Sequence, residues 1–303
     1  MKIVIPGGAG FVGRNLVRYL YQSRYNMEDV VVIDYNKEYI KYVKKYGAHT
    51  VNADLTTAGE WYEEFNDADI VINLAAQLSS PDNELFYRNN ILTVKNIIEA
   101  MEKSSVQRII HTSSASVLSE WQDDYSRTKK EGEDLVVNSG IEYCVIQPSI
   151  MYGPTDETNI GYLIDFARKI PIFPIPGHGK WPRQPIYIDD ISNLLLQLTR
   201  NFPKNRIISI NGKEVILFKD MVKTVLKEIG GIKIRVFLPL KLFIFLMMAY
   251  QKIRGSNDFT PDQVRALTTI ETFKEEPWWD EFNVPFTSFN DGVKAMVNHK
   301  ELI

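Results

Sequence analysis

Three glycines with a fixed spacing stand directly after the first apolar run of the chain. The segment reads Gly7-x-x-Gly10-x-x-Gly13 and follows residues 2–6, a short run that is typical of a strand. Glycines at this spacing allow a tight turn, a close approach of the backbone to a pyrophosphate, and close packing of the next helix on the strand. That helix would also point its first N–H groups at the phosphates. The spacing predicts a dinucleotide-binding turn; the alternative is a turn with only a structural role.

An acidic residue, Asp34, ends the next apolar run 21 residues beyond Gly13. This spacing is typical of the carboxylate that accepts a hydrogen bond from the 2′-hydroxyl of an adenosine ribose. The same carboxylate would repel a 2′-phosphate, so it favours NAD over NADP. Tyr35 and Asn36 follow, and Lys37 is the only cation nearby in the sequence. We therefore expect NAD as the cofactor.

A tyrosine and a lysine four residues apart, Tyr125 and Lys129, fall within a segment that has the pattern of a helix. Side chains at this spacing lie on one helical face. An ammonium group beside a phenol favours the phenolate, so the phenol could act as a base nearer to neutral pH. Upstream, hydroxyl residues at 112–116, Ser114 among them, close a strand-like run, where ligands of parallel sheets bind. The pair predicts proton transfer, although its spacing alone is also that of a plain surface pair.

Buried strands and helices must position these residues, and the first half of the chain alternates between the two patterns. The short runs are rich in β-branched residues and lack polar–apolar alternation, as strands buried on both faces do. Helical patterns separate them, and Gly140 follows the last one as a C-terminal cap would. This order predicts an α/β fold with a doubly wound, Rossmann-type parallel sheet. The expected strands are 2–6, 30–34, 50–54, 70–75, 108–113 and 141–147, and the expected helices are 12–22, 39–46, 90–102 and 126–138.

The alternation ends after Pro148. Residues 170–185 are crowded with proline and glycine, which predicts a long ordered loop, and helices are expected at 189–200 and 218–229. We expect the second half to form a smaller, irregular substrate-binding region, with some segments packing back on the first domain. The expected domains are an NAD-binding domain at residues 1–155 and the substrate-binding region at residues 156–303.

An apolar run at residues 236–250 raises the question of a membrane segment. Pro239 and Lys241 interrupt it, and the uncharged part from Leu242 covers only about half of a bilayer. No transmembrane segment is expected. A buried helix or a face of a possible homodimer is the favoured interpretation, and contact with a membrane surface or a lipid-like substrate is the alternative.

The composition is typical of a soluble globular protein and excludes several classes of function. The 303 residues carry 35 Lys and Arg against 38 Asp and Glu, and the net charge of −3 argues against a nucleic-acid partner. A single cysteine, Cys144, excludes a disulfide scaffold, and the four histidines are too scattered for a metal site. Met1 leads at once into the first expected strand, so we expect no targeting segment and a cytoplasmic protein.

Taken together, these motifs resemble the extended short-chain dehydrogenases/reductases, the NAD-dependent epimerase/dehydratase family. The resemblance covers most of the chain and implies the fold and the cofactor that the motifs predict. Besides the glycine turn, Asp34, Ser114, Tyr125 and Lys129, it rests on Asp54-Leu55, Asn73-Leu74-Ala75-Ala76, Asn90, Pro148, Tyr152-Gly153-Pro154, Arg183 and Tyr187-Ile188-Asp189-Asp190.

The resemblance implies a role for each matching residue. Tyr125 would be the general acid/base, Lys129 would hold the nicotinamide ribose and tune the phenol, and Ser114 would bind the reacting oxygen of the substrate. Arg183 matches an arginine that commonly binds the diphosphate of a nucleotide sugar, since a fork of guanidinium donors suits that anion. The residues implied in NAD binding are Gly7, Gly10, Phe11, Val12, Gly13, Asp34, Asp54, Leu55, Leu74, Ala75, Ala76, Asn90, Tyr125, Lys129 and Pro148.

The chain departs from the family pattern at positions that bear on the reaction. Ala115 and Ser116 stand where the dehydratases of the family place an Asp-Glu pair, so dehydration is disfavoured. Gln147 replaces a frequent arginine. Residues 171–190 resemble an atypical branch that includes the complex I peripheral subunit and related reductases.

We therefore expect an NAD-dependent epimerase or keto-reductase that acts on a nucleotide-activated sugar, by hydride transfer and with Tyr125 as the acid/base. One alternative is a redox-silent, dinucleotide-binding assembly protein. A second is a reductase of a lipid-like, non-sugar substrate. Retention of Ser114, Tyr125 and Lys129 together favours catalysis.

Overall fold

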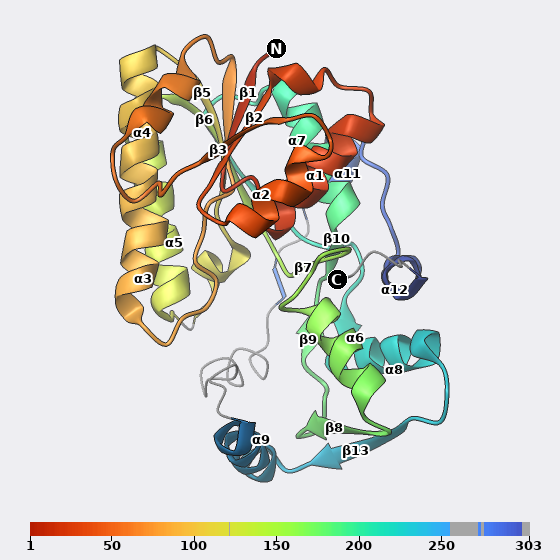
Figure 1. Ribbon diagram of the computed structural model, residues 1–303. Helices are drawn as coiled ribbons and strands as arrows, with labels where there is room; N and C mark the ends of the chain where they lie inside the picture. Colours follow the sequence, from red (N-terminus) through yellow and green to blue (C-terminus); the bar gives the residue numbers. More distant parts are fainter. Residues whose placement is uncertain (121, 255–271, 274–275, 299–303) are drawn as a thin grey trace. The chain divides into compact units, whose positions relative to one another are not determined.

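The computed structural model describes residues 1–120, 122–254, 272–273 and 276–298 (Figure 1). The chain forms two compact units. The first unit combines Met1–Ser149 with two later segments, Ile188–Ile210 and Glu276–Phe286. Segments from the second half of the chain therefore complete the first unit. The second unit comprises Ile150–Tyr187, Asn211–Glu275 and Thr287–Ile303, as far as they are described.

The first unit is built on a seven-stranded sheet with the order β11-β6-β5-β4-β1-β2-β3, and every neighbouring pair is parallel. The predicted Rossmann-type fold is confirmed. The strand order reverses between β1 and β4, and ligands of open α/β sheets bind beyond the carboxyl ends of the strands at such a reversal. The strands are β1 (Ile3–Pro6), β2 (Val30–Asp34), β3 (His49–Asn52), β4 (Ile70–Asn73), β5 (Arg108–Thr112), β6 (Glu142–Pro148) and β11 (Arg206–Ile210).

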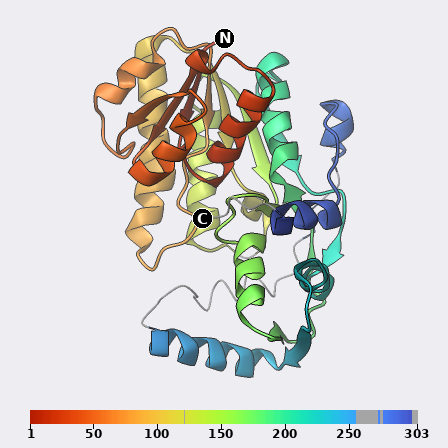
Figure 2. The ribbon, with the colours of Figure 1, turned by 45° about the vertical axis from the view of Figure 1, so that its right-hand side comes forward.

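Helices cover both faces of this sheet (Figures 1 and 2). Every residue of β1, β2 and β4 is buried, which explains why these runs are apolar without alternation. On one face, α4 (Thr93–Ser104) and α5 (Asp124–Val137) share a core with the strands. On the other, α1 (Phe11–Gln22) packs against α7 (Ile188–Arg200). The remaining elements of this unit are η1 (Met27–Asp29), α2 (Lys37–Lys44), η2 (Glu60–Phe65), α3 (Asn83–Tyr87), η3 (Arg88–Leu92), η4 (Ala115–Leu118) and α11 (Trp278–Glu281).

A π-helical turn, η3, precedes α4 where the sequence predicts the start of a regular helix. The short helix α3 just before it is not predicted either. The backbone of η3 comes so close to α5 that a Cβ on Gly132 would lie 2.7 Å from the carbonyl oxygen of Asn90. This contact between segments far apart in the sequence has no local signal.

The second unit is smaller, and its strands form three separate pairs: β7 with β10, β9 with β12, and β8 with β13. The predicted helix at 218–229 is confirmed as α8. The predicted loop at 170–185 is wrong in part, because β8 and β9 lie within it. The elements are β7 (Met151–Tyr152), α6 (Ile160–Lys169), β8 (Ile172–Pro176), β9 (Pro182–Arg183), β10 (Ile186–Tyr187), β12 (Ile216–Leu217), α8 (Phe218–Ile229), β13 (Ile234–Leu238), α9 (Leu240–Arg254) and α12 (Phe289–Asn298).

The apolar run at residues 236–250 is divided between β13 and α9. Phe243 is only 7% exposed, but Phe245 is 66% and Met248 is 56% exposed. Of the two favoured interpretations, a buried helix does not fit the outward side of α9, and the face of a possible homodimer stays a prediction. Among the helices that the structure describes, none is long and apolar enough to cross a membrane.

Candidate active site

The glycine turn lies between β1 and α1, at the point where the strand order reverses. Gly7 has a φ of +71°, and a Cβ there would lie 2.5 Å from the backbone of Ala75. A Cβ on Gly13 would lie 2.3 Å from the carbonyl oxygen of Gly8. At Gly10 the nearest atom would be 3.3 Å away. Packing within the chain therefore requires the first and third glycines. The second glycine leaves space in which a pyrophosphate can approach the protein backbone.

The first turn of α1 also suits an anion. Gly10 occupies its N-cap position, no side chain caps the helix, and no acidic residue lies in the first turn. The first N–H groups of a helix lack intrahelical partners and carry a partial positive charge. These groups fit the pyrophosphate of NAD, and Phe11 and Val12 lie in this same turn.

Asp34 ends β2 and is tied to the glycine turn. Its carboxylate accepts hydrogen bonds from the backbone N–H groups of Ala9, at 3.1 Å, and Asn36, at 3.0 Å. Burial raises the pKa of this carboxyl, and the backbone donors and the Arg14 guanidinium oppose that rise. The side chain is 7% exposed and lies at the carboxyl end of β2, beside the glycine turn.

Arg14 is a residue that the sequence analysis missed. The guanidinium carbon lies 4.1 Å from the centre of the Tyr39 ring, and its charge opposes the rise in the pKa of Asp34. The local sequence indicates Lys37 as the only cation near Asp34, and the structure adds Arg14. The one signal for Arg14 is its position directly after Gly13, at the start of the helix.

The residues expected near the adenine lie after β3. The Asp54 carboxylate is exposed, accepts a hydrogen bond from the Thr56 N–H at 2.9 Å, and lies 3.7 Å from the Arg88 guanidinium. Leu55 is buried, and its carbonyl accepts a hydrogen bond from the Asn96 side chain at 2.9 Å. The loop that carries both residues is therefore held by contacts with η3 and α4.

The segment that follows β4 runs next to the glycine turn. The Leu74 N–H donates to the carbonyl of Pro6 at 2.9 Å, and the Ala75 N–H donates to the Asn73 side chain at 3.1 Å. Ala76, the last residue of this predicted group, is exposed. Small residues fit here because the backbone of Gly7 is so close.

The Asn90 side chain forms hydrogen bonds to two separate segments of the chain. Its side-chain oxygen accepts a hydrogen bond from the Gln77 N–H at 2.7 Å, and its amide donates to the Thr128 hydroxyl at 2.9 Å. Thr128 lies in α5, next to Lys129. The Asn90 side chain thus links the segment after β4 to the helix that carries Tyr125 and Lys129.

Ser114, Tyr125 and Lys129 come together at the carboxyl end of β5. Tyr125 and Lys129 lie in α5, whose start is fixed by a capping box between Asp123 and Ser126. The Ser114 side chain hydrogen-bonds to the Tyr125 phenol. The Lys129 ammonium donates to the carbonyl of Thr112 at 2.6 Å. Tyr125 thus contacts Ser114, and Lys129 contacts the backbone at the end of the same strand.

The ionisation of this group differs from the sequence-based argument. Burial raises the pKa of the Tyr125 phenol, and the hydrogen bond from Ser114 opposes the rise. Burial lowers the pKa of Lys129 to about 8, and the Glu133 carboxylate opposes that fall. The phenol therefore carries its proton at neutral pH and is set to donate it.

A buried histidine beside this group was missed by the sequence analysis. His111 lies in β5, its Nδ1 is 3.0 Å from the Asn73 amide nitrogen, and burial together with the Lys129 charge holds its pKa well below the usual value. Within the described residues, His111 Nε2, Thr112 Oγ1 and Ser113 Oγ are buried without a hydrogen-bond partner. Such groups cost stability, and they are typical of functional sites.

Two further predicted residues belong to different units. Pro148 ends β6 and pairs in register with Ile210 of β11, so it lies at the same sheet edge as the glycine turn. Arg183 belongs to the second unit, where it lies in β9 opposite Ile216 of β12. Its side chain is 5% exposed, and its Nη1 donates to the carbonyl of Pro182 at 2.7 Å.

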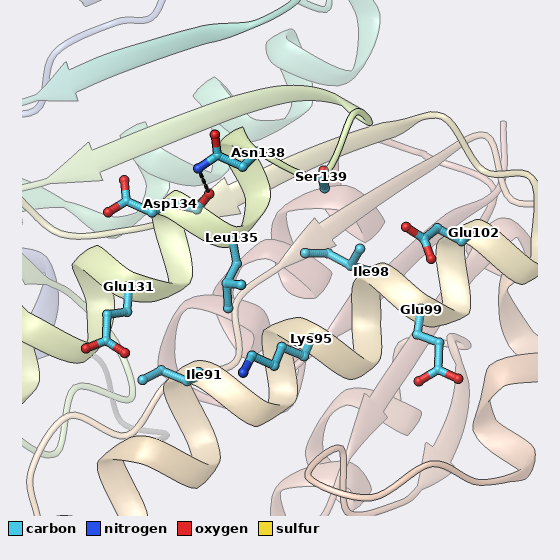
Figure 3. A pocket seen from close by; sticks show the side chains of 10 residues that line it. All are labelled: Ile91, Lys95, Ile98, Glu99, Glu102, Glu131, Asp134, Leu135, Asn138 and Ser139. Atoms are coloured by element: carbon cyan, nitrogen blue, oxygen red, sulfur yellow. Dashed lines mark hydrogen bonds between the residues drawn. The ribbon is translucent and has the colours of Figure 1, made fainter.

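A groove of about 510 Å³ lies between α4 and α5 (Figure 3). Apolar residues lie in it, and carboxylates and one lysine surround them. It contains none of the residues predicted for NAD or the substrate. The lining residues are Ile91, Lys95, Ile98, Glu99, Glu102, Glu131, Asp134, Leu135, Asn138 and Ser139.

Residues 3–211 match the family model described as the NAD dependent epimerase/dehydratase family. The chain belongs to this family. It is therefore an NAD-dependent enzyme of the epimerase/oxidoreductase type, and NAD is its cofactor. The resemblance that the motifs carry is confirmed.

Relatives at the level of sequence differ in their substrates. The chain is 26% identical to the 3beta-hydroxysteroid-dehydrogenase/decarboxylase isoform 2 of Arabidopsis thaliana, over 97% of this chain and 61% of that protein. Isoform 1 of the same enzyme is also 26% identical, with 78% of its length covered. A putative UDP-glucose 4-epimerase of Methanocaldococcus jannaschii is 29% identical over 75% of this chain and 82% of that protein.

Solved structures share the fold over nearly the whole chain. A UDP-glucose 4-epimerase of Thermotoga maritima, solved with UDP-glucose, has a TM-score of 0.77 at 19% identity and covers 98% of this chain and 97% of its own. A UDP-glucuronic acid 4-epimerase of Bacillus cereus, in complex with NAD, has a TM-score of 0.73 at 22% identity, with 98% of both chains covered. At these identities the likeness shows the fold.

Proposed function

We propose that the protein is an NAD-dependent epimerase of a nucleotide-activated sugar, with Tyr125 as its general acid/base. The observation that carries the proposal is the meeting of Ser114, Tyr125 and Lys129 at the carboxyl end of β5, in the unit that also holds the glycine turn and Asp34. A phenol, a hydroxyl and an ammonium at one strand end are suited to interconvert a hydroxyl group and a ketone.

The residues divide the work on the reacting oxygen. Ser114 binds this oxygen through its hydroxyl, and Tyr125 takes the hydroxyl proton or returns it. NAD, when bound, would supply the hydride acceptor for the adjacent carbon. Lys129, whose ammonium donates to the carbonyl of Thr112, would hold the ribose of NAD. Burial raises the pKa of the Tyr125 phenol, which favours its role as the proton donor in the half of the cycle that converts a ketone to a hydroxyl.

Two observations support a nucleotide sugar as the substrate. Arg183 is a buried arginine in the second unit, and its guanidinium fork could bind a diphosphate in bidentate fashion. Relatives named as UDP-sugar 4-epimerases match the chain in sequence and in fold. Ala115 and Ser116 stand where a dehydratase would place two acids, which supports epimerisation over dehydration.

A second candidate is the oxidation of an apolar secondary alcohol or the reduction of the matching ketone. It is favoured by the two 3beta-hydroxysteroid-dehydrogenase/decarboxylase relatives, which match 97% of this chain. The same Ser114, Tyr125 and Lys129 would serve this reaction, since it is half of the epimerase cycle. The two candidates differ in their net redox change.

The test is to incubate the purified protein with a panel of UDP-sugars and with 3β-hydroxysteroids, each with NAD. Sugar isomers and NADH absorbance are followed together, and Tyr125→Phe is the matched inactive control. Interconversion of C4 epimers without net NADH supports the epimerase. NADH formed with a steroid, and no sugar isomer, overturns it in favour of the second candidate. No change with any substrate contradicts both.

A further inference from the structure

One surface of the second unit exposes large apolar side chains that the proposed reaction does not use. It is formed by the paired strands β8 and β13 and by α9, which follows β13 in the chain and packs against β8 (Figure 2). We call it the β13–α9 surface. The apolar residues of these three elements that are 37–66% exposed are Ile172, Ile234, Val236, Phe237, Leu242, Phe245, Leu246 and Met248, with Phe237 on the opposite face of the strand pair from Val236.

The outward side of α9 has a regular pattern. Phe243 points inward and is 7% exposed. Four exposed residues on the other side of the helix are spaced by four, three and four positions: Lys241, Phe245, Met248 and Lys252. Positions with these spacings lie along one stripe of a helix. The outward stripe is therefore apolar in the middle and has a lysine at each end.

The charge around this surface opposes that of the whole chain. The chain carries a net −3, yet no acidic residue stands between Glu228 and Asp258 in the sequence, and basic residues lie at 233, 235, 241 and 252. Lys233 is used internally, since its ammonium donates to the carbonyls of Ala167, at 2.6 Å, and Ile170, at 2.9 Å. Lys241 and Lys252 form no ion pair within the part of the chain that the structure describes.

We propose that the β13–α9 surface docks on a membrane surface that contains anionic lipids, with α9 lying in the plane of the headgroups. Phe245 and Met248 would enter the boundary of the acyl chains, and Lys241 and Lys252 would reach the lipid phosphates through their long stems. The helix has 15 residues, about 22 Å, which is too short to span the bilayer core of about 30 Å.

A second copy of the chain fits this surface less well. Two copies facing one another would bring lysines together, and the surface offers no carboxylate to pair with them. Like charges held close together disfavour association. An anionic lipid surface supplies the missing negative charge. The inference does not depend on the proposed substrate.

Binding of the full chain to vesicles tests the proposal by co-sedimentation. Vesicles of phosphatidylcholine alone are compared with vesicles in which a third of the lipid is phosphatidylserine, at low and at high salt. We expect binding to the anionic vesicles, weakened by salt and much weaker on phosphatidylcholine. Lys241→Gln with Lys252→Gln should lower the affinity about 30-fold, and Phe245→Asp with Met248→Asp should abolish sedimentation.

Matched variants separate this surface from general stickiness. Val215→Asp replaces an apolar residue that is 53% exposed elsewhere in the second unit, and Lys223→Gln with Lys227→Gln removes two exposed lysines of α8. These controls should sediment as the unmodified protein does. NAD binding and circular dichroism should be unchanged in every variant.

Three results would overturn the proposal. The first is that the protein sediments with neither kind of vesicle. The second is that the control variants lose as much vesicle binding as the variants of the surface. The third is that the unmodified protein is a dimer that does not bind vesicles, and that Phe245→Asp converts it to a monomer. The last result, measured by light scattering, would show that a second copy covers the surface. All of these readouts are independent of turnover, so failure here leaves the proposed function untouched.

Discussion

At the scale of single residues, the proton on Tyr125 decides whether the site can work as proposed. Tyr125→Phe removes one oxygen and keeps the ring, so the fold and the NAD affinity should survive. Turnover should fall by about 10²–10⁴-fold, because a positioned proton donor contributes about that much. Single-turnover rates and NAD dissociation constants measure the two effects. Tyr21→Phe, at a 54% exposed position of α1, is the control, and unchanged turnover in Tyr125→Phe would refute the assignment.

Lys129 predicts how stability depends on pH. Its pKa of about 8 lies below the ordinary 10.5, because the ammonium is buried. Between these two pH values the unfolded chain holds a proton that the folded chain has released, so the free energy of unfolding should rise with pH in that window. Urea unfolding below pH 8 and between pH 8 and 10.5 measures this rise. In Lys129→Met the contribution should vanish; an equal rise in both proteins would show that other groups cause it.

Asp34 predicts the choice of cofactor. Asp34→Ala removes the carboxylate expected on the ribose, so NAD affinity should fall by about 1–3 kcal/mol. Arg14 stays in place and no longer faces a carboxylate, so the affinity for NADP relative to NAD should rise. Glu38→Ala is the control, because Glu38 is an exposed acid of α2 that pairs with Lys41. Titration with both cofactors measures the effect, and an unchanged NADP-to-NAD ratio would count against the role of Asp34.

At the scale of elements, the β1–α1 turn separates glycines needed for folding from one needed for binding. Gly7→Ala and Gly13→Ala place a Cβ within 2.5 Å of backbone atoms, so both should lower the melting temperature. Gly10→Ala meets nothing closer than 3.3 Å, so it should melt close to the unmodified protein while its NAD affinity falls. Thermal melting without NAD, followed by NAD titration, measures both. If all three variants melted alike, this division of roles would be wrong.

At the scale of the whole molecule, NAD and the substrate are predicted to depend on different units. The glycine turn and Asp34 lie in the first unit, and Arg183 lies in the second. Arg183→Ala should therefore raise the KM for a nucleotide sugar and leave the NAD dissociation constant nearly unchanged. Lys180→Ala, at a nearby exposed position, is the control. A KM equal to that of the unmodified protein would remove Arg183 from the substrate site.

Much of the first unit follows from the sequence alone. Strands buried on both faces must be apolar throughout, and helices between them must be amphipathic, so the alternation of the two patterns predicts a parallel sheet. The glycine turn and Asp34 are equally local, because turn geometry and the register of β1 and β2 bring them together within one strand–helix–strand unit. Family membership follows from these same motifs.

Tertiary packing alone decided the rest. Arg14 faces Asp34, and His111 lies beside Lys129, through contacts between elements that carry no local pattern. The run at 236–250 is the clearest case, because a helix that is apolar nearly all round does not indicate which side will be covered. Its neighbours decide that: Phe243 is buried, and Phe245 is left in the open. Periodicity reports burial only where polar residues mark the exposed side, and here that side is apolar.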